Sequence, residues 1–171
     1  TQPVDLNKVR NMCKPAIYPG TFDPVTFGHI DLIRRSLEIF PEIIVAVAEN
    51  AHKKPLFTLE ERVKLLKKAV EGMEGVSVES FKGLVVDFAH KKHLKVLIRG
   101  VRMFSDFEYE LQMALTNRKL AADIETVYLM PQEGYSYLSS RLLKEAASLG
   151  ADLTSFVPDF VAKPLIEKLK R

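Results

Sequence analysis

The chain has 171 residues, of which 47% are hydrophobic and 27% charged, and its formal net charge is +3. This composition is that of an ordinary globular protein with one buried core, and the mild positive charge suits small anionic ligands without requiring a nucleic acid. The single cysteine, Cys13, excludes an internal disulfide, and no apolar run approaches the roughly 20 residues of a membrane helix. We therefore expect a cytoplasmic protein whose partners are neither nucleic acids nor membranes.

The first residues are polar and follow no pattern, and Met12 comes just before the first apolar run. They contain no apolar core of a signal peptide. We expect residues 1–13 to form a disordered leader, with Met12 as the natural start and the residues before it left over from expression. Residues 14–171 are then expected to form a single domain.

Strand and helix patterns alternate along the rest of the chain. Solid apolar runs, such as 43–48, are typical of strands covered on both faces, whereas apolar residues three and four apart indicate helices. Two helix starts have the spacing of a capping box, Thr58 before Glu61 and Ser105 before Glu108. The predicted elements are strand 14–18, helix 28–40, strand 42–48, helix 58–73, strand 76–81, helix 84–92, strand 94–99, helix 105–120, strand 124–130, helix 138–148 and helix 158–170.

This alternation predicts the α/β class, with a Rossmann-like, doubly wound sheet of five parallel strands flanked by helices and a C-terminal helix. Ligands of such sheets bind beyond the carboxyl ends of the strands. Hydrogen-bond donors and cations follow four of these ends, in segments 21–29, 49–55, 99–102 and 131–141. We expect all four segments to open onto one crevice, and together they supply what a polyphosphate site requires.

The connection after the first strand is the most informative segment. The apolar run stops at a Pro-Gly break, and a helical pattern begins with Gly28 and His29. The free N–H groups of a helix N-terminus attract phosphate, and an imidazole in the first turn can add one more directed donor. The segment resembles the T/HxGH signature of the nucleotidyltransferase superfamily, here in the form Thr21 followed by Phe27-Gly28-His29.

Five segments together resemble the bacterial phosphopantetheine adenylyltransferase family, from about Lys14 to the C-terminus. They are Tyr-Pro-Gly-Thr-Phe-Asp-Pro at 18–24, Lys-Lys-Pro-Leu-Phe-Thr-Leu-Glu-Glu-Arg at 53–62, Leu-Ile-Arg-Gly-Val-Arg at 97–102, Asp-Phe-Glu-Tyr-Glu at 106–110 and Tyr-Leu-Ser-Ser at 137–140. The resemblance implies adenylyl transfer from ATP to 4′-phosphopantetheine, which gives dephospho-coenzyme A and pyrophosphate in coenzyme A biosynthesis. Because the attacking phosphate is already ionised, we expect direct in-line attack, with no general base and no covalent enzyme intermediate.

The resemblance also implies roles for single residues at the nucleotide. His29 would donate to the α-phosphate and stabilise the transition state, and Thr21 would lie between the two substrates as the second catalytic residue. The segment 135–141 would close over ATP, with the serines at a helix start facing the β- and γ-phosphates. The residues expected to bind ATP are Thr21, Phe22, His29, Gly100, Val101, Arg102, Glu110, Tyr135, Ser136, Tyr137, Leu138, Ser139, Ser140 and Arg141.

At the acceptor, Lys53 and Arg99 would hold the phosphate of 4′-phosphopantetheine beside Thr21, and the pantetheine arm would pass Leu84 and Val85. No carboxylate cluster forms a dedicated metal site, and Mg²⁺ prefers phosphate oxygens and water, so we expect it to arrive with ATP. The family is usually a hexamer built from trimers, which implies a homohexamer here. Dephospho-coenzyme A and coenzyme A itself are the further ligands that the resemblance suggests.

Each of these residues also has an ordinary structural explanation. A histidine at a helix start is usually a surface or capping residue, and paired lysines such as Lys53 and its neighbour usually face solvent. Glu110 could pair with a residue one turn away, and Val85 could belong to the core. Ser139 and Ser140 could be helix N-caps, a role that is compatible with a phosphate site.

Three positions depart from the family pattern. Phe27 stands where asparagine is more usual, and Arg141 where some members have a serine. Tyr135 stands where tryptophan is frequent, so an aromatic ring that could cover adenine is retained.

Two other functions remain open from the sequence. A sister nucleotidyltransferase would move AMP or CMP to another phosphate acceptor, such as nicotinate mononucleotide or glycerol 3-phosphate. The discriminating segments are 53–55 and 97–100, because they would read the acceptor phosphate. A non-catalytic nucleotide sensor or RNA-binding module is the more distant alternative, and the absence of an aromatic and basic single-strand platform argues against RNA.

Overall fold

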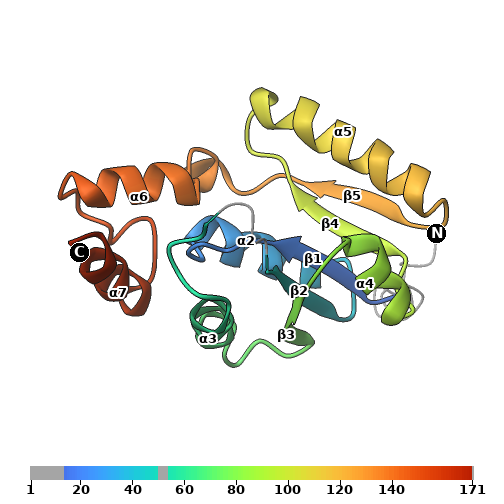
Figure 1. Ribbon diagram of the computed structural model, residues 1–171, viewed down its shortest axis with the longest axis horizontal. Coiled ribbons are helices and arrows are strands. Elements are labelled where there is room, and N and C mark those ends of the chain that lie inside the picture. Colours follow the sequence, from blue (N-terminus) through green and yellow to red (C-terminus); the bar gives the residue numbers. More distant parts are fainter. Residues whose placement is uncertain (1–13, 50–53, 171) are drawn as a thin grey trace, which may run out of the picture.

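The computed structural model describes residues 14–49 and 54–170, and its centre is a parallel sheet of five strands in the order β3-β2-β1-β4-β5 (Figure 1). The chain winds outward from β1 to β3 and then restarts at β4 on the other side of β1, which confirms the Rossmann-like, doubly wound sheet. A ligand crevice is expected at this reversal, between β1 and β4. The strands are β1 (Ala16–Gly20), β2 (Ile43–Ala48), β3 (Val76–Phe81), β4 (Val96–Gly100) and β5 (Glu125–Leu129).

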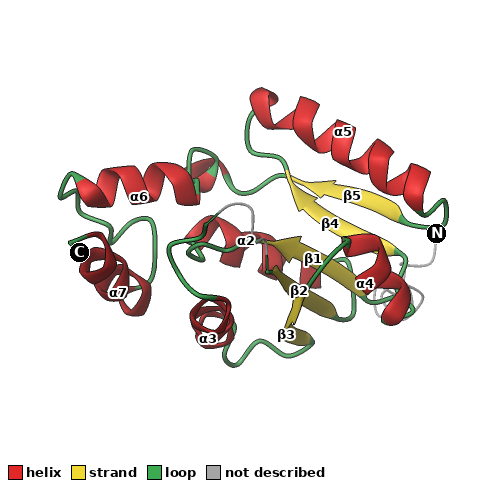
Figure 2. Ribbon diagram, viewed as in Figure 1, coloured by secondary structure: helices red, strands yellow, loops and turns green. Residues whose placement is uncertain are grey.

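Helices cover both faces of the sheet, and the alternation of side chains along each strand divides the core between them. Tyr18 and Val45 pack in one cluster with residues of α2, α3, α6 and α7, whereas Ile17 and Ala46 pack in a second cluster with residues of α4. In Figure 2 the arrowheads of β1 and β4 point toward the end of the molecule that carries α6 and α7. The helices are α2 (Phe27–Leu37), α3 (Leu59–Ala69), α4 (Val85–Lys91), α5 (Phe104–Leu120), α6 (Ser140–Ser148) and α7 (Asp159–Leu169). Within the described residues, no helix is both long and apolar enough to cross a membrane.

One of the two predicted capping boxes is confirmed and the other is wrong. Thr58 caps α3 and exchanges hydrogen bonds with Glu61, as the spacing predicted. At α5 the extended residue Met103 is the N-cap, so Ser105 already lies inside the first turn. α5 begins at Phe104, one residue earlier than predicted. Near this start, the carboxylate of Asp106 accepts a hydrogen bond from the main-chain N–H of Arg102.

The prediction that β1 stops before Pro19 is also wrong. The strand continues through Pro19 and Gly20, which pair in register with Ala46 and Val47 of β2. β4 pairs with β1 only further back, at Ile17, so the missing N–H of Pro19 leaves no gap in that ladder. The sequence analysis also missed a short 3-10 helix, Glu133–Tyr135, because it assigned the residues between strand 124–130 and helix 138–148 to a loop.

Candidate active site

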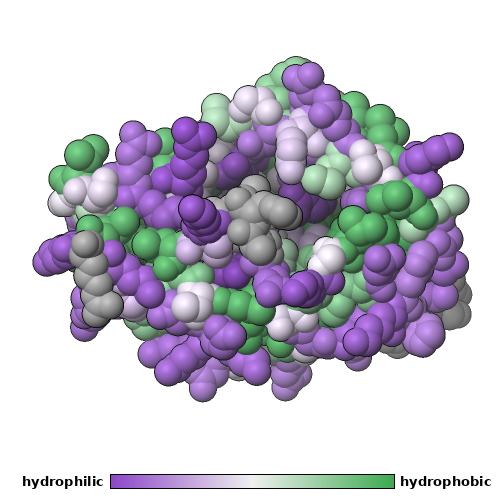
Figure 3. All heavy atoms as spheres, in the orientation of Figure 1, coloured by the Kyte–Doolittle hydropathy of each residue, from purple (hydrophilic) through white to green (hydrophobic). Residues whose placement is uncertain are grey.

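A cavity of about 740 Å³ lies where the carboxyl ends of the strands meet. Thr21 after β1, Pro55 after β2, Arg99 at the end of β4 and Pro131 after β5 all line it, so the structure confirms the single crevice that the sequence predicts. The face in Figure 3 is hollowed near its centre, and hydrophilic residues rim much of the hollow. The lining of the cavity combines apolar side chains, such as Leu97 and Met113, with charged ones, such as Arg99 and Lys144.

Most residues predicted to bind substrate line this cavity. They are Thr21, Phe22, His29, Val85, Arg99, Gly100, Arg102, Glu110, Leu138, Ser139, Ser140 and Arg141. Five others do not line it, namely Leu84, Val101, Tyr135, Ser136 and Tyr137. Lys53, the predicted lysine of the acceptor site, lies outside the described residues.

The residues away from the cavity have other contacts. Val101 is buried, and its N–H donates to the carbonyl of Leu129 at 3.0 Å. Tyr135 lines a separate cavity of about 430 Å³, where its ring faces that of Phe27 with the centroids 6.3 Å apart. Two positions that depart from the family pattern therefore pack on each other, and the ring of Tyr135 does not reach the larger cavity.

His29 is held by a reciprocal capping box at the start of α2. Its main-chain N–H donates to the Thr26 hydroxyl, and its Nδ1 accepts the main-chain N–H of Thr26 at 3.0 Å. An accepting Nδ1 carries no proton in the neutral ring, so the proton is on Nε2. Burial, and then the charges of Arg102 and Arg99, lower the pKa of His29 to about 4. The ring is thus a neutral, oriented donor on the wall of the cavity.

Thr26 is a site residue that the sequence analysis missed. That analysis joined Thr21 to the signature, but the structure gives the contact with His29 to Thr26, whose Oγ1 also lies 3.0 Å from Nδ1. Thr26 directly precedes Phe27-Gly28-His29, so the unbroken spacing Thr-x-Gly-His was the signal that could have found it. The capping and catalytic interpretations of His29 are compatible, because capping uses Nδ1 and leaves Nε2.

Thr21 and Phe22 form the tight connection that leaves β1. Phe22 has a φ of 49°, in the left-handed region that residues with a Cβ seldom adopt. Its ring meets the rings of Tyr18 and His29 edge-on, with centroids 5.4 and 5.0 Å away. A Cβ on Gly20 would lie 2.8 Å from the Phe22 ring, so only glycine allows this packing.

Asp23 ties three segments together beneath this connection. Its side chain is buried and accepts the main-chain N–H groups of Leu56 and Phe57 at 3.0 and 2.9 Å. The Lys144 ammonium on α6 completes the cluster at 2.6 Å. Asp23 and Lys144 both line the cavity, and no local signal in the sequence indicated their pairing, because they are 121 positions apart.

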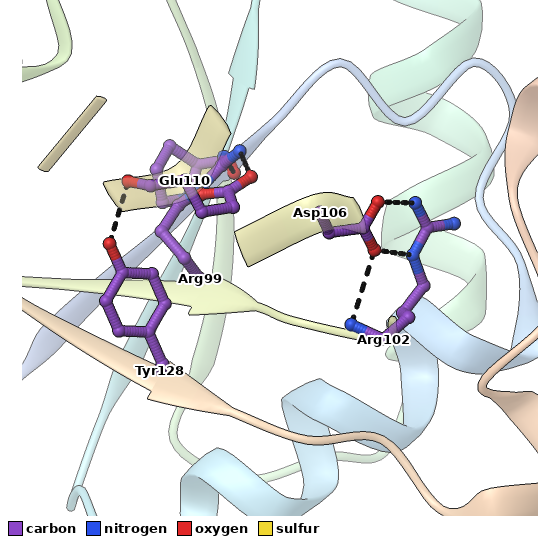
Figure 4. A network of polar contacts seen from close by, with 6 residues as sticks. Arg99, Arg102, Asp106, Glu110 and Tyr128 are labelled. Atoms are coloured by element: carbon purple, nitrogen blue, oxygen red, sulfur yellow. Dashed lines mark hydrogen bonds and ion pairs between the residues drawn. The ribbon is translucent and has the colours of Figure 1, made fainter. Parts of the chain in front are cut away.

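Arg99 and Glu110 form a bidentate ion pair across the cavity wall (Figure 4). Arg99 Nε and Nη2 donate to the two Glu110 oxygens at 2.7 and 2.6 Å, and Nη1 donates to the carbonyl of Pro19 at 2.9 Å. Burial alone would lower the pKa of Arg99, but the hydrogen bonds and charge of Glu110 outweigh it and raise that pKa. Tyr128 on β5 donates to the Glu110 carbonyl at 2.8 Å. The ion-pair partner of Glu110 therefore comes from β4 and not from its own helix.

Arg102 makes the second ion pair of this wall. Its Nε donates to Asp106 at 3.0 Å, and its Nη2 donates to the other carboxylate oxygen at 3.2 Å (Figure 4). Its remaining Nη1 donates to the carbonyl of Leu138, just before α6. The guanidinium thus joins the exit of β4 to the segment that leads into α6.

α5 contributes a row of cavity residues that the sequence analysis did not select. Tyr109, Met113 and Asn117 are spaced by four along the helix, so they share one face, and all three line the cavity. Asn117 is buried, although asparagine is usually exposed. A polar residue at helical spacing from Glu110 was the signal that could have found this face.

Two helix N-termini, those of α2 and α6, lie at the cavity. Ser139 is the N-cap of α6, where its hydroxyl accepts the N–H of Leu142 at 3.1 Å, and the Ser140 hydroxyl donates to the carbonyl of Pro24 at 2.8 Å. Free N–H groups at such ends bind anions, so the arrangement can hold two phosphate-bearing molecules. Among residues 14–49 and 54–170, no group of three His, Cys, Asp or Glu side chains could hold a metal ion.

The class of protein that this fold and site define is the nucleotidyltransferase class, and the cytidylyltransferase-like family model matches residues 17–146. A phosphopantetheine adenylyltransferase from Caldanaerobacter subterraneus is 52% identical, over 91% of this chain and 98% of that protein. One from Dictyoglomus thermophilum is 53% identical, over 90% and 93%. In fold, the chain is similar to Plasmodium falciparum nicotinic acid mononucleotide adenylyltransferase (TM-score 0.64, 12% identity, 92% of this chain and 95% of that one). The chain belongs to the phosphopantetheine adenylyltransferase family.

Proposed function

We infer that the chain transfers the adenylyl group of ATP to 4′-phosphopantetheine, giving dephospho-coenzyme A and pyrophosphate in coenzyme A biosynthesis. Relatives that are about half identical over nine tenths of the chain carry this activity in their names. The observation in the structure that supports it best is the shared cavity of His29, Arg99 and Arg102, which two helix N-termini also face.

The reaction needs little from the protein beyond position and charge. An oxygen of the acceptor phosphate attacks the α-phosphorus of ATP, and the bond from the α-phosphorus to the bridging oxygen breaks as pyrophosphate leaves with the electron pair. We propose that the Nε2–H of His29 donates to the α-phosphate as negative charge grows on it. Thr21 lies between the substrates in this proposal, and the N-terminus of α6 faces the β- and γ-phosphates.

Arg99 binds the acceptor phosphate in this proposal. Its ion pair with Glu110 limits which of its N–H groups the phosphate can reach. The two Glu110 oxygens occupy Nε and Nη2, so a phosphate must either displace the carboxylate or share the guanidinium with it. Because a guanidinium has five donors, sharing is chemically reasonable. Glu110 then keeps Arg99 oriented while the acceptor is absent.

We propose that Mg²⁺ enters as part of the substrate, MgATP. The carboxylate nearest the catalytic turn, Asp23, already binds two main-chain N–H groups and the Lys144 ammonium, which suits it poorly to a cation. Phosphate oxygens and water are the usual ligands of Mg²⁺ at nucleotide sites. The cytoplasm is the proposed compartment, since a chain with a single cysteine relies on no internal disulfide.

We further propose that the chain assembles into a homohexamer, as the family usually does, and that α5 contributes to an interface. Phe104, Phe107, Leu111 and Leu115 lie on one side of α5 and are 94%, 43%, 40% and 55% exposed. A contiguous apolar stripe on a helix is typical of a surface that another chain covers. Light scattering after size exclusion tests this, and Leu111→Asp should lower the molar mass of the assembly.

The activity is tested by incubating the protein with MgATP and a panel of phosphorylated acceptors while pyrophosphate release is measured. We expect release with 4′-phosphopantetheine at least about 100-fold faster than with nicotinate mononucleotide or glycerol 3-phosphate. A preference for another acceptor would favour the sister nucleotidyltransferase. Nucleotide binding without pyrophosphate release from any acceptor would favour a non-catalytic module.

A further inference from the structure

Arg62 on α3 is a buried charge that the reaction as described does not use. Only 1% of its surface is exposed, and it does not line the cavity. Burial lowers the pKa of its guanidinium more than the charges of Asp23 and Glu60 raise it, and within the described residues no carboxylate forms an ion pair with it. A charge buried in this way is costly unless its hydrogen bonds are fully met, so its position calls for an explanation.

The guanidinium of Arg62 donates only to main-chain carbonyls, and these belong to three separate segments. Nη1 donates to Thr21 at 2.7 Å and to Ala48 at 2.8 Å. Nη2 donates to Glu49 at 3.3 Å, and Nε donates to Phe57 at 3.2 Å. The planar guanidinium therefore joins the exit of β1, the exit of β2 and the approach to α3.

We propose that Arg62 is a positioning residue for the adenylyl transfer, because it fixes the peptide that joins Thr21 to Phe22. This inference rests on the proposed function. The Thr21 carbonyl that accepts from Nη1 belongs to that peptide, and its orientation sets the left-handed φ of 49° at Phe22. If the peptide rotates, the side chains on both sides of it move with it.

The effect of Arg62 extends from this peptide to His29. The Phe22 ring is buried and packs edge-on against the His29 ring, with the centroids 5.0 Å apart. The Arg62 guanidinium thus binds the backbone of Thr21 directly and supports the His29 ring through Phe22. Errors of about 1 Å in such positions can slow a reaction by roughly 100-fold while substrates still bind.

The first test is Arg62→Lys, which keeps the charge but offers a single nitrogen that cannot reach all three segments. We expect kcat for pyrophosphate release to fall about 10- to 100-fold, with the KM values for ATP and acceptor changed less than about 3-fold. The matched control is Leu66→Ala, which removes a fully buried side chain one turn further along α3. The control lowers stability but should keep kcat at temperatures where circular dichroism shows both variants folded.

Chemical rescue separates position from general stability. In Arg62→Ala, millimolar guanidinium can enter the space left by the side chain, and we expect it to raise kcat several-fold. The same ion should not raise kcat in Leu66→Ala, because guanidinium otherwise weakens folding. A wild-type kcat in Arg62→Lys, or an equal loss of kcat in Leu66→Ala, would overturn the proposal.

A readout without substrates keeps this test independent of the proposed function. The NMR signal of the His29 Cε1–H is assigned by its loss in His29→Gln. We expect this signal to shift in Arg62→Lys and to stay in place in Leu66→Ala. An unmoved signal in Arg62→Lys overturns the positioning role even if the wild-type protein proves to act on another acceptor.

Discussion

The two sides of the active cavity are built from different kinds of contact. On the side of β1 and β2, charged and polar side chains bind the main chain: Arg62 holds four carbonyls, Asp23 holds two N–H groups, and Thr26 and His29 cap each other. These groups are largely shielded from water. Arg62 lies outside the cavity and Asp23 is buried, so we expect this side to keep its geometry whether or not substrate is bound.

On the side of β4 and α5, two arginines each donate to one main-chain carbonyl but direct two of their nitrogens to a side-chain carboxylate. Arg99 pairs with Glu110, and Arg102 pairs with Asp106, in geometries that a phosphate could share or displace (Figure 4). The comparison indicates that one side sets the geometry of the reacting atoms while the other adapts its charges to the acceptor and nucleotide. Variants on the two sides should therefore fail in different ways.

The largest effect is expected from His29→Ala on the fixed side. We expect kcat to fall roughly 10²–10³-fold with little change in either KM, because the Nε2–H acts on charge that develops only in the transition state. Steady-state pyrophosphate release measures both quantities. If KM rises and kcat is unchanged, His29 is a binding residue and the assigned role is wrong.

The next effect is on stability, in Asp23→Ala. Removing this buried acceptor leaves the N–H groups of Leu56 and Phe57 without partners and the Lys144 ammonium unpaired, so we expect the free energy of unfolding to fall by about 3 kcal/mol. Urea denaturation measures it. Asp152→Ala is the control, since that exposed carboxylate bonds only Thr154 and its loss should cost less than about 1 kcal/mol.

Arg99→Ala tests the adaptable side. We expect the KM for 4′-phosphopantetheine to rise about 10- to 100-fold, the range for a lost charge-assisted hydrogen bond, and the KM for ATP to rise far less. Glu110 also loses its partner in this variant, so unfolding must be measured alongside. Equal weakening of both substrates would assign Arg99 to the nucleotide or to both.

The depressed pKa of His29 gives the fixed side a pH dependence. The folded protein binds this proton only near pH 4, whereas an unfolded chain binds it near the ordinary value of about 6.5, so the free energy of unfolding should fall as the pH drops between those values. At about 1.4 kcal/mol per pKa unit, less the solvent screening of a partly exposed ring, we expect a loss of roughly 1–3 kcal/mol. The loss should shrink in His29→Asn, measured by urea denaturation from pH 7.5 to pH 4. Parallel curves for the two proteins would show that His29 titrates normally.

The same contrast explains what the sequence could predict. The sheet, its helices and the shared crevice follow from apolar periodicity and from the rule for strand ends, and Thr58 was found as a cap because its partner Glu61 is three residues away. Arg62 was missed because its partners are main-chain carbonyls, which no side-chain pattern marks. Asp23 and Lys144 were missed because only the tertiary fold brings them together. Sequence patterns therefore do not reveal contacts between a side chain and the main chain, or contacts between residues that are far apart in the sequence.

The smallest effect is expected from Asp106→Asn, which tests how far the two sides of the cavity differ. Arg102 lies just before the N-cap of α5 and pairs with Asp106 in the first turn. The two side chains are 33% and 27% exposed, so water screens the pair, and we expect the free energy of unfolding to change by less than about 0.5 kcal/mol. Glu110→Gln is the matched variant, because its side chain is only 9% exposed and Arg99 would be left with an uncharged partner. Urea denaturation at low and high salt should show a larger loss for Glu110→Gln, and salt should reduce the small loss in Asp106→Asn. If Asp106→Asn costs as much as Asp23→Ala, the ion pairs of α5 are as fixed as the contacts around β1, and the division between a rigid and an adaptable side fails.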